Sequence, residues 1–250
     1  MTALVLAEAR KLRRTRSLLA LPLLAVAYPL VTLAAAAFAP EGERATLDAG
    51  LLLGALRGVA DVARFAALMV GILAVAGEFR HGTIVPALLA TPRRARLVAA
   101  KLVSQAGTGL VVALAASAVC LATAGPWLAG QGVDVDPLSG DVALVVLGAT
   151  VGVVCYAAIG AALGWLVRNQ TAAIAGALVW LLAVEEVIPI VLRRPGLRRW
   201  LPGGAATSLL RLGEPAVGAG RAWAALALLL AVTAALAAAA FVAVARADVD

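Results

Sequence analysis

Five ionisable residues lie within long apolar stretches, where a charge is costly and usually faces a protein interior or a water-filled path. Arg57, Asp61 and Arg64 are spaced four and three residues apart, so they share one face of a helix. Asp61 can neutralise one arginine, which leaves a positive charge able to attract an anionic group. Glu185 and Glu186 are adjacent in a later stretch. Carboxylates in such a place can relay a proton, gate a polar path or pair with cations.

Two interpretations of these groups stay open. The first group either lines a polar substrate path or pairs internally near the outer interface and holds helices together. For Glu185 and Glu186, outer gating or pairing with Arg193 and Arg194 is favoured over a proton relay.

The sequence argues against several kinds of catalytic site. A Walker A loop needs a lysine after a glycine, and neither Lys11 nor Lys101, the only lysines, follows one. His81 is the only histidine, so a histidine-based metal site would lack partners. Cys120 and Cys155 fall at different depths of apolar stretches, where small-residue packing is expected. We therefore expect no catalytic residue, no metal ligand and no cofactor held by this chain.

The composition places the chain in a membrane. Apolar residues make up 63% of it and charged residues 14%, whereas soluble domains are about 45–50% apolar and about 25% charged. Lipid must therefore cover most of the exterior. The net charge of +7 comes from arginine clusters, which we assign to anionic headgroups and to topology, and not to nucleic acid.

Six apolar stretches are long enough to cross a bilayer as helices, which takes about 20 residues. They cover residues 18–39, 56–76, 102–124, 141–167, 171–192 and 222–245. Within lipid only helices or a closed barrel satisfy the backbone, and these stretches are too long and too uniform for barrel strands. The sequence predicts an all-α polytopic membrane protein with one transmembrane domain over residues 1–250.

The segments between the spans predict an orientation. Residues 1–17 are basic and form either an interfacial elbow helix on the cytoplasmic surface or a basic tail that sets topology. Lysine and arginine are more numerous on the side of the N-terminus, so both termini are predicted to be cytoplasmic. Residues 193–221 then form an outer loop, whose basic stretch 193–204 departs from the positive-inside rule.

Glycines at helical spacing predict close contacts between helices, because small residues four apart let backbones approach. One set shares a face of the fourth span together with Tyr156, and another leads into the second span. These glycines are Gly148, Gly152, Gly160 and Gly164 in the first set and Gly50, Gly54 and Gly58 in the second.

The connector over residues 77–101 is too polar for a simple turn between the second and third spans. Gly77 can end a helix, and Thr83 can cap a following one over the sequence IVPALLA. Thr91-Pro92 then ends that segment. The pattern predicts a short helix on the cytoplasmic face, held by a polar turn at each end and able to receive a push from a partner.

Three groups of residues at this connector form a longer pattern: Gly77-Glu78-Phe79-Arg80-x-Gly82-Thr83, Leu89-x-Thr91-Pro92-x-Arg94 and Ala100-Lys101. This pattern resembles the signature of ABC-2-type transporter permeases. In that family the segment after the second of six spans is a coupling helix that docks on an ATP-binding subunit. The resemblance implies that the following residues serve this coupling: Glu78, Phe79, Arg80, Gly82, Thr83, Pro92 and Arg94.

The resemblance implies a function as the permease subunit of an ATP-driven exporter in a bacterial plasma membrane. ATP and magnesium would be bound by a separate ATP-binding subunit, and a second permease subunit would complete the bundle. The chain itself would not be an enzyme. Two alternatives remain: an ion-coupled secondary transporter that uses Asp61 and Glu185, and a non-transporting membrane component of an ABC-type assembly or resistance complex.

Overall fold

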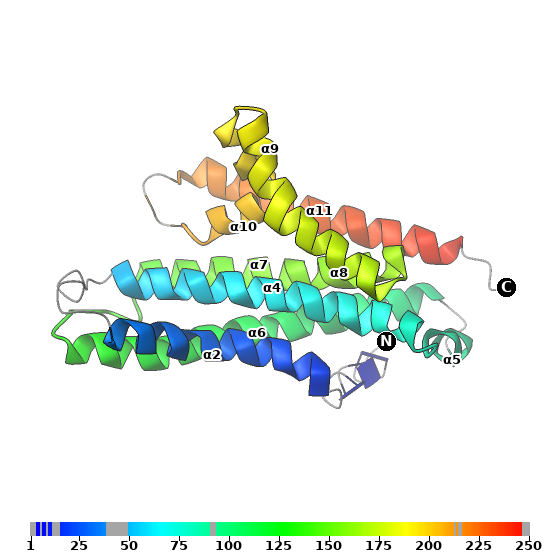
Figure 1. Ribbon diagram of the computed structural model, residues 1–250, viewed down its shortest axis with the longest axis horizontal. Coiled ribbons are helices and arrows are strands. Elements are labelled where there is room, and N and C mark those ends of the chain that lie inside the picture. The colour runs from blue at the N-terminus through cyan, green and yellow to red at the C-terminus, as the bar shows by residue number, and fades with distance from the viewer. Residues whose placement is uncertain are drawn as a thin grey trace.

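The computed structural model describes residues 4–5, 7–8, 10–11, 16–38, 50–90, 94–212, 214 and 217–246, and all regular elements among them are helical (Figure 1). The elements in chain order are α2 (Arg16–Ala37), α4 (Gly50–Arg80), α5 (Ile84–Ala90), α6 (Arg94–Gly130), α7 (Gly140–Val167), α8 (Gln170–Val179), a π-helical turn η1 (Trp180–Val184), α9 (Glu185–Val191), a 3₁₀ helix η2 (Pro195–Trp200), α10 (Pro202–Leu209) and α11 (Ala219–Ala245).

Five of the described helical segments are long and apolar enough to cross a membrane. They are α4, α6, α7, α11 and the continuous segment Gln170–Val191 formed by α8, η1 and α9. Each predicted span after the first overlaps one of these. The helices extend beyond the predicted limits by as many as eight residues, at the start of α6, except that the fifth predicted span, 171–192, is one residue longer than its helix at the C-terminal end. The first predicted span corresponds to α2, whose apolar segment over the described residues Ala20–Ala35 is shorter.

The long helices run side by side and define two ends of the molecule (Figure 1). Helix α5 and the C-terminal end of α11 lie at one end, which we call the α5 end. Helices α4 and α11 begin at the opposite end. The described residues near the N-terminus are helical, and among them Leu4 packs against the buried cluster that includes Val75 and Trp165.

Helices α4 and α7 form the centre of the bundle, and glycine allows their close approach. A methyl group added to Gly160 of α7 would lie 2.2 Å from the carbonyl oxygen of Leu68, and one added to Gly71 of α4 would lie 2.4 Å from that of Ala157. Both distances are far below van der Waals contact, so a larger residue at either position would push the two helices apart. The prediction for this face of α7 is confirmed.

The same face of α7 changes partner along its length. At Gly148 an added methyl group would lie 2.0 Å from the carbonyl oxygen of Leu209, so here α7 packs on the C-terminal end of α10. The prediction for the second glycine set was only partly right. Gly58 abuts the ring of Tyr28 in α2, but no atom lies within 4 Å of a methyl group added to Gly54.

The predicted outer loop over residues 193–221 contains the helices η2 and α10. Helix α10 is mostly buried, with Gly203, Gly204, Ala205 and Ala206 all shielded from solvent. Its small residues let it enter the bundle, and a methyl group at Gly204 would lie 1.9 Å from the carbonyl oxygen of Arg198 in η2. Sequence hydropathy hid this element because an eight-residue helix is far too short to register as a span.

Candidate functional site

The predicted connector helix exists as α5, which covers the predicted sequence IVPALLA. A three-residue turn links it to α4, and in this turn Gly82 adopts a φ of 67°, a left-handed conformation that favours glycine. Arg80, His81, Gly82 and Thr83 are all exposed. The end of α4 and the turn therefore present the Arg80 and His81 side chains to whatever lies beyond the α5 end.

Helix α5 carries an uncovered apolar surface. Ile84 is buried and anchors the helix on α4, α6 and α7 residues, whereas Leu89 is 77% exposed and Val85 is also exposed. Pro92 lies outside the described residues. Arg94 is half-buried at the first position of α6.

Glu78 does not belong to the exposed turn. Its side chain is buried at the end of α4, where it pairs with Lys101 of α6 at 2.8 Å and with Lys11 near the N-terminus. Lys101 is 2% exposed and also pairs with Glu8 at 2.8 Å. The carboxylates of Glu78 and Glu8 therefore hold the Lys101 ammonium group inside the protein.

These four residues, which we call the ion cluster, join three separate parts of the chain. Glu8, Lys11, Glu78 and Lys101 carry two negative and two positive charges, so the cluster as a whole is neutral. Neutrality matters because an uncompensated buried charge is strongly destabilising. The cluster fixes the N-terminal segment, the end of α4 and the start of α6 to one another.

Phe79 also points inward. Its ring lies 5.7 Å from that of Trp165 in α7 in an edge-to-face arrangement, a favoured geometry for aromatic pairs. Of the residues that the resemblance assigned to coupling, Glu78 and Phe79 therefore support the connector from within, while Arg80, Gly82 and Thr83 face outward.

The charged residues of α4 contact α10 and the segment after it. Arg57 donates a hydrogen bond from Nε to the carbonyl oxygen of Leu210 at 3.1 Å and forms an ion pair with Glu214 at 2.6 Å. Arg57 thus serves the C-terminal end of α10, where free carbonyl groups and the helix dipole favour a cation. It does not pair with Asp61, so the three α4 residues are not one self-paired group.

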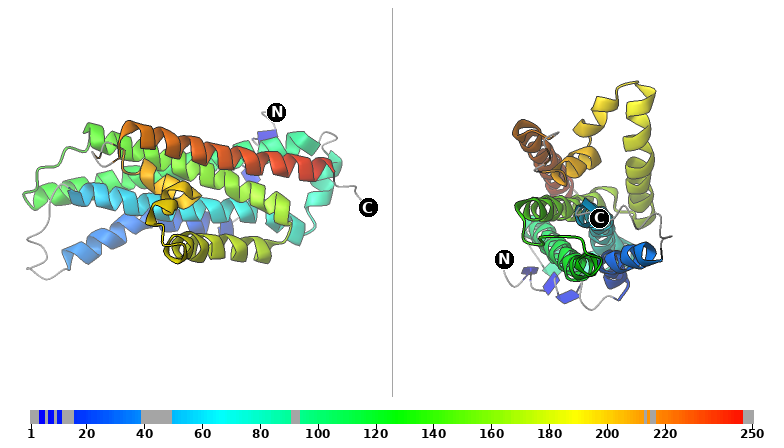
Figure 2. Two further views of the ribbon diagram at one scale, coloured as in Figure 1. Left: turned by 90° about the horizontal axis from the view of Figure 1, so that it is seen from above. Right: turned by 90° about the vertical axis from the view of Figure 1, so that its left-hand side faces the viewer.

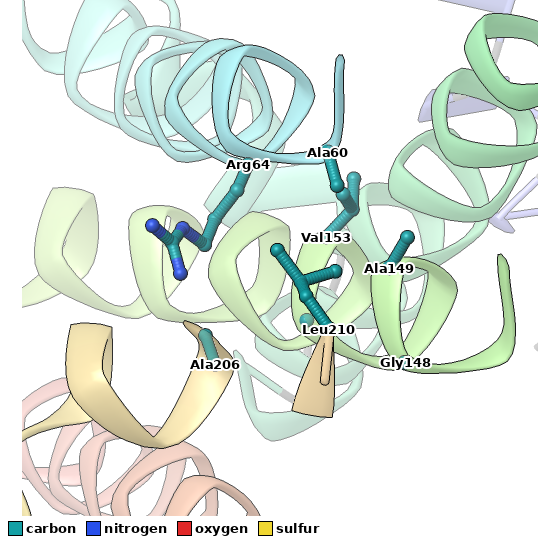
Figure 3. Close-up of a pocket in the computed structure, with 8 residues that line it drawn as sticks. Ala60, Arg64, Gly148, Ala149, Val153, Ala206 and Leu210 are labelled. Carbon is teal, nitrogen blue, oxygen red and sulfur yellow. The ribbon is translucent and has the colours of Figure 1, made fainter. Parts of the chain in front are cut away.

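Arg64 lies near the middle of α4 and makes three contacts. It pairs with Asp61 at 2.7 Å, donates to the carbonyl oxygen of Gly203 at 3.3 Å and stacks 5.1 Å above the ring of Tyr156. Beside it is a cavity of about 10 Å³, walled by α4, α7 and α10 (Figure 3). A space of this size holds about one water molecule, so this conformation leaves no room for a substrate beside Arg64.

Glu185 binds the other end of α10. The carboxylate is 4% exposed and accepts hydrogen bonds at Oε1 from the indole of Trp180 at 2.9 Å and from the backbone N–H of Gly203 at 3.0 Å. An anion is favourable at a helix N-terminus, where backbone N–H groups lack intrahelical partners. A methyl group at Gly203 would lie 2.0 Å from Glu185 Oε2, so glycine is needed for this contact.

Glu186 faces the other way and pairs with Arg198 of η2. Arg193 and Arg194 were expected to serve Glu185 and Glu186, and in the described part of the chain they do not. Helix α10 is therefore held at one end by Glu185 and Arg64 and at the other by Arg57. We call these contacts the α10 clamp.

The contacts of these charged residues fix the positions of helices. No group of three potential metal-ligating residues occurs among the described residues. The sequence interpretation missed Glu214, placed Tyr156 on the glycine face of α7 without its contact to Arg64, and did not connect Glu8 with Lys101. A signal for the last pair was present, since Glu8 interrupts an apolar helical face and Lys101 opens an apolar span.

Comparison with known proteins agrees with this architecture. A search of individual curated proteins finds no significant match. The family model described as "ABC-2 family transporter protein" matches residues 2–249, nearly the whole chain. Members of this family are membrane components of transport systems and not themselves catalytic. The chain, a multi-pass membrane protein, therefore belongs to the ABC-2 family of transporter proteins.

Proposed function

We propose that this protein is the permease subunit of an ATP-driven exporter and that α5 is the helix on which a separate ATP-binding subunit docks. The observation that carries the proposal is the uncovered apolar surface of α5 next to the exposed turn containing Arg80. Val85 and Leu89 are one helical turn apart and both exposed, so they form an apolar patch of the kind that a partner or a lipid surface covers. In this assignment the α5 end is cytoplasmic, and α2 is the remaining span of a six-helix bundle.

The ion cluster supports this proposal because it makes the α5 end stiff. A push on α5 reaches α4 through the short turn and through the buried Ile84, and it reaches α6 through the Glu78–Lys101 pair. Rigid elements joined in this way move together, so a partner that prefers one conformation can shift the whole bundle toward it. ATP and magnesium would be bound by the partner.

Asp61 of α4 is an exposed charged residue that a second permease subunit would cover. Asp61 lies about 16 Å along α4 from Gly50, yet its side chain is half exposed in the single chain. Phe65, one turn further along the same helix, is also exposed. A carboxylate facing lipid at such depth is costly, so we assign this face of α4 to contact with another permease subunit.

The α10 clamp is the proposed gate at the opposite end. In the present conformation Arg57, Arg64 and Glu185 fix α10 against α4 and α7, and the cavity beside Arg64 is too small for a substrate. Export requires these contacts to loosen. The assignment of Glu185 as a helix cap also weakens the ion-coupled alternative, because a carboxylate that takes up and releases protons would repeatedly lose this role.

The experiment that tests the proposal is purification of the tagged chain from its native membrane in a mild detergent. We expect an ATP-hydrolysing subunit with a Walker A peptide to accompany it, and the Leu89→Glu variant to lose that subunit. The matched control is Leu138→Glu, since Leu138 is 92% exposed in a loop at the opposite end. Retention of the subunit by Leu89→Glu would refute α5 as the docking element. Absence of any ATP-hydrolysing subunit with the unaltered chain would refute the exporter assignment.

A further inference from the structure

A large apolar groove lies between α8 and α11. These two helices diverge from the bundle with α10 between them (Figure 2). The groove has a volume of about 630 Å³, and α7 contributes its floor. Its walls include Ile159, Ala173, Gly176, Leu181 and Leu236, and none of its described lining residues carries a charge.

A smaller cationic pocket adjoins this groove. Its volume is about 310 Å³, and Arg199 and Arg221 line it together with Ser208. No carboxylate occurs among its described lining residues. The two spaces share the side chain of Trp200, which lies beside Arg199 with the guanidinium 5.9 Å from the ring centre.

The two spaces are arranged in sequence along α11. The cationic pocket contacts the helix at Ala225, near its first residues, and the groove contacts it from Val232 to Leu236. Seven residues of α helix correspond to a rise of about 10 Å. The cationic pocket therefore lies toward the membrane surface and the groove toward the membrane interior, which is the order of headgroup and acyl chains in a phospholipid.

Charge complementarity identifies the occupant. We propose that the groove and the cationic pocket together bind one phospholipid with an anionic headgroup, taken from the surrounding bilayer, with its phosphate near Arg199 and Arg221. Arginine is well suited to a phosphate because its planar donors can bind two oxygens at once. Basic residues are unusual in an outer loop. Phosphate binding would account for their presence in the segment at the end opposite α5.

Other basic residues do not serve equally well. Arg57 and Arg198 line neither of the two spaces. Arg194 lies in the same segment and is exposed, but it lines neither space. It therefore supplies a control of equal charge. The proposal concerns binding by this chain alone and does not require ATP-driven export.

The test is native mass spectrometry of the purified protein in a non-ionic detergent, titrated with phosphatidylglycerol or phosphatidylcholine of identical acyl chains. We expect the unaltered chain to prefer phosphatidylglycerol. The double change Arg199→Gln with Arg221→Gln should weaken phosphatidylglycerol binding roughly tenfold, the equivalent of one charge-assisted hydrogen bond, while Arg194→Gln should leave it unchanged. Circular dichroism of each variant verifies its helical content.

A second variant tests the groove independently. No atom lies within 4 Å of a methyl group added to Gly176, so Gly176→Leu extends into the groove without a clash at its first atom. We expect it to weaken binding of both lipids. Equal affinity of the double arginine variant and the unaltered chain for phosphatidylglycerol would overturn the proposal. So would a dimer that excludes lipid and is disrupted by Gly176→Leu, since the groove would then be an interface between copies of this chain.

Discussion

Replacing Lys101 by methionine should destabilise the protein strongly, because the buried ammonium group serves two carboxylates. Methionine has nearly the length of lysine, so the change removes charge with little loss of volume. Glu78 would keep its pair with the half-exposed Lys11, whereas Glu8 would lose its cation in the described part of the chain. Removing one partner of a buried ion pair typically costs about 3–5 kcal/mol. We expect the lower part of this range, about 3 kcal/mol, since Lys11 remains.

The assay is unfolding of the purified protein by increasing mole fraction of sodium dodecyl sulfate, followed by circular dichroism. The control Lys11→Met should cost less than about 1 kcal/mol, as is usual for a pair with one half-exposed partner. Glu78→Gln combined with Lys101→Met should cost less than the sum of the two single changes, because the double change removes opposite charges together. A cost for Lys101→Met below about 1 kcal/mol, or strict additivity in the double variant, would refute the role assigned to the ion cluster.

Two further predictions concern the α10 clamp. Gly203→Ala should lower the free energy of unfolding by about 2 kcal/mol, since the new methyl group would displace the Glu185 carboxylate and leave it without its backbone donor. The control in the same assay is Gly176→Ala, where the space is open, and it should show no loss. Equal stability of the two variants would contradict the role of Glu185 as a helix cap. Arg57→Leu should increase the rate of amide hydrogen exchange in α10 by about tenfold, because the hydrogen bond to the Leu210 carbonyl and the ion pair with Glu214 are both lost. An unchanged exchange rate would show that packing alone holds α10.

Local sequence was enough to find the long helices and the connector. Hydropathy depends on the solvent around a segment, and in lipid each spanning segment must satisfy its own backbone, so a stretch such as 141–167 becomes a helix whatever its neighbours are. The short helix at α5 was also predicted, with Thr83 directly before its first residue. The expectation that Gly77 ends the preceding helix was wrong, because α4 continues to Arg80. Sequence likewise showed which charged residues lie inside apolar stretches and which glycines share a face of α7.

What the sequence could not assign was the partner of each charge. Arg57 was grouped with Asp61 by helical spacing, but it pairs with Glu214, which lies 157 positions further along the chain by the difference of residue numbers. Glu185 was matched with the nearby arginines, and it caps α10. Spacing along one helix reports only which side chains share a face. The choice of partner depends on which helix packs there. That is decided by tertiary contacts such as the approach of α10 to Gly148, where the lack of a side chain lets the two backbones come close.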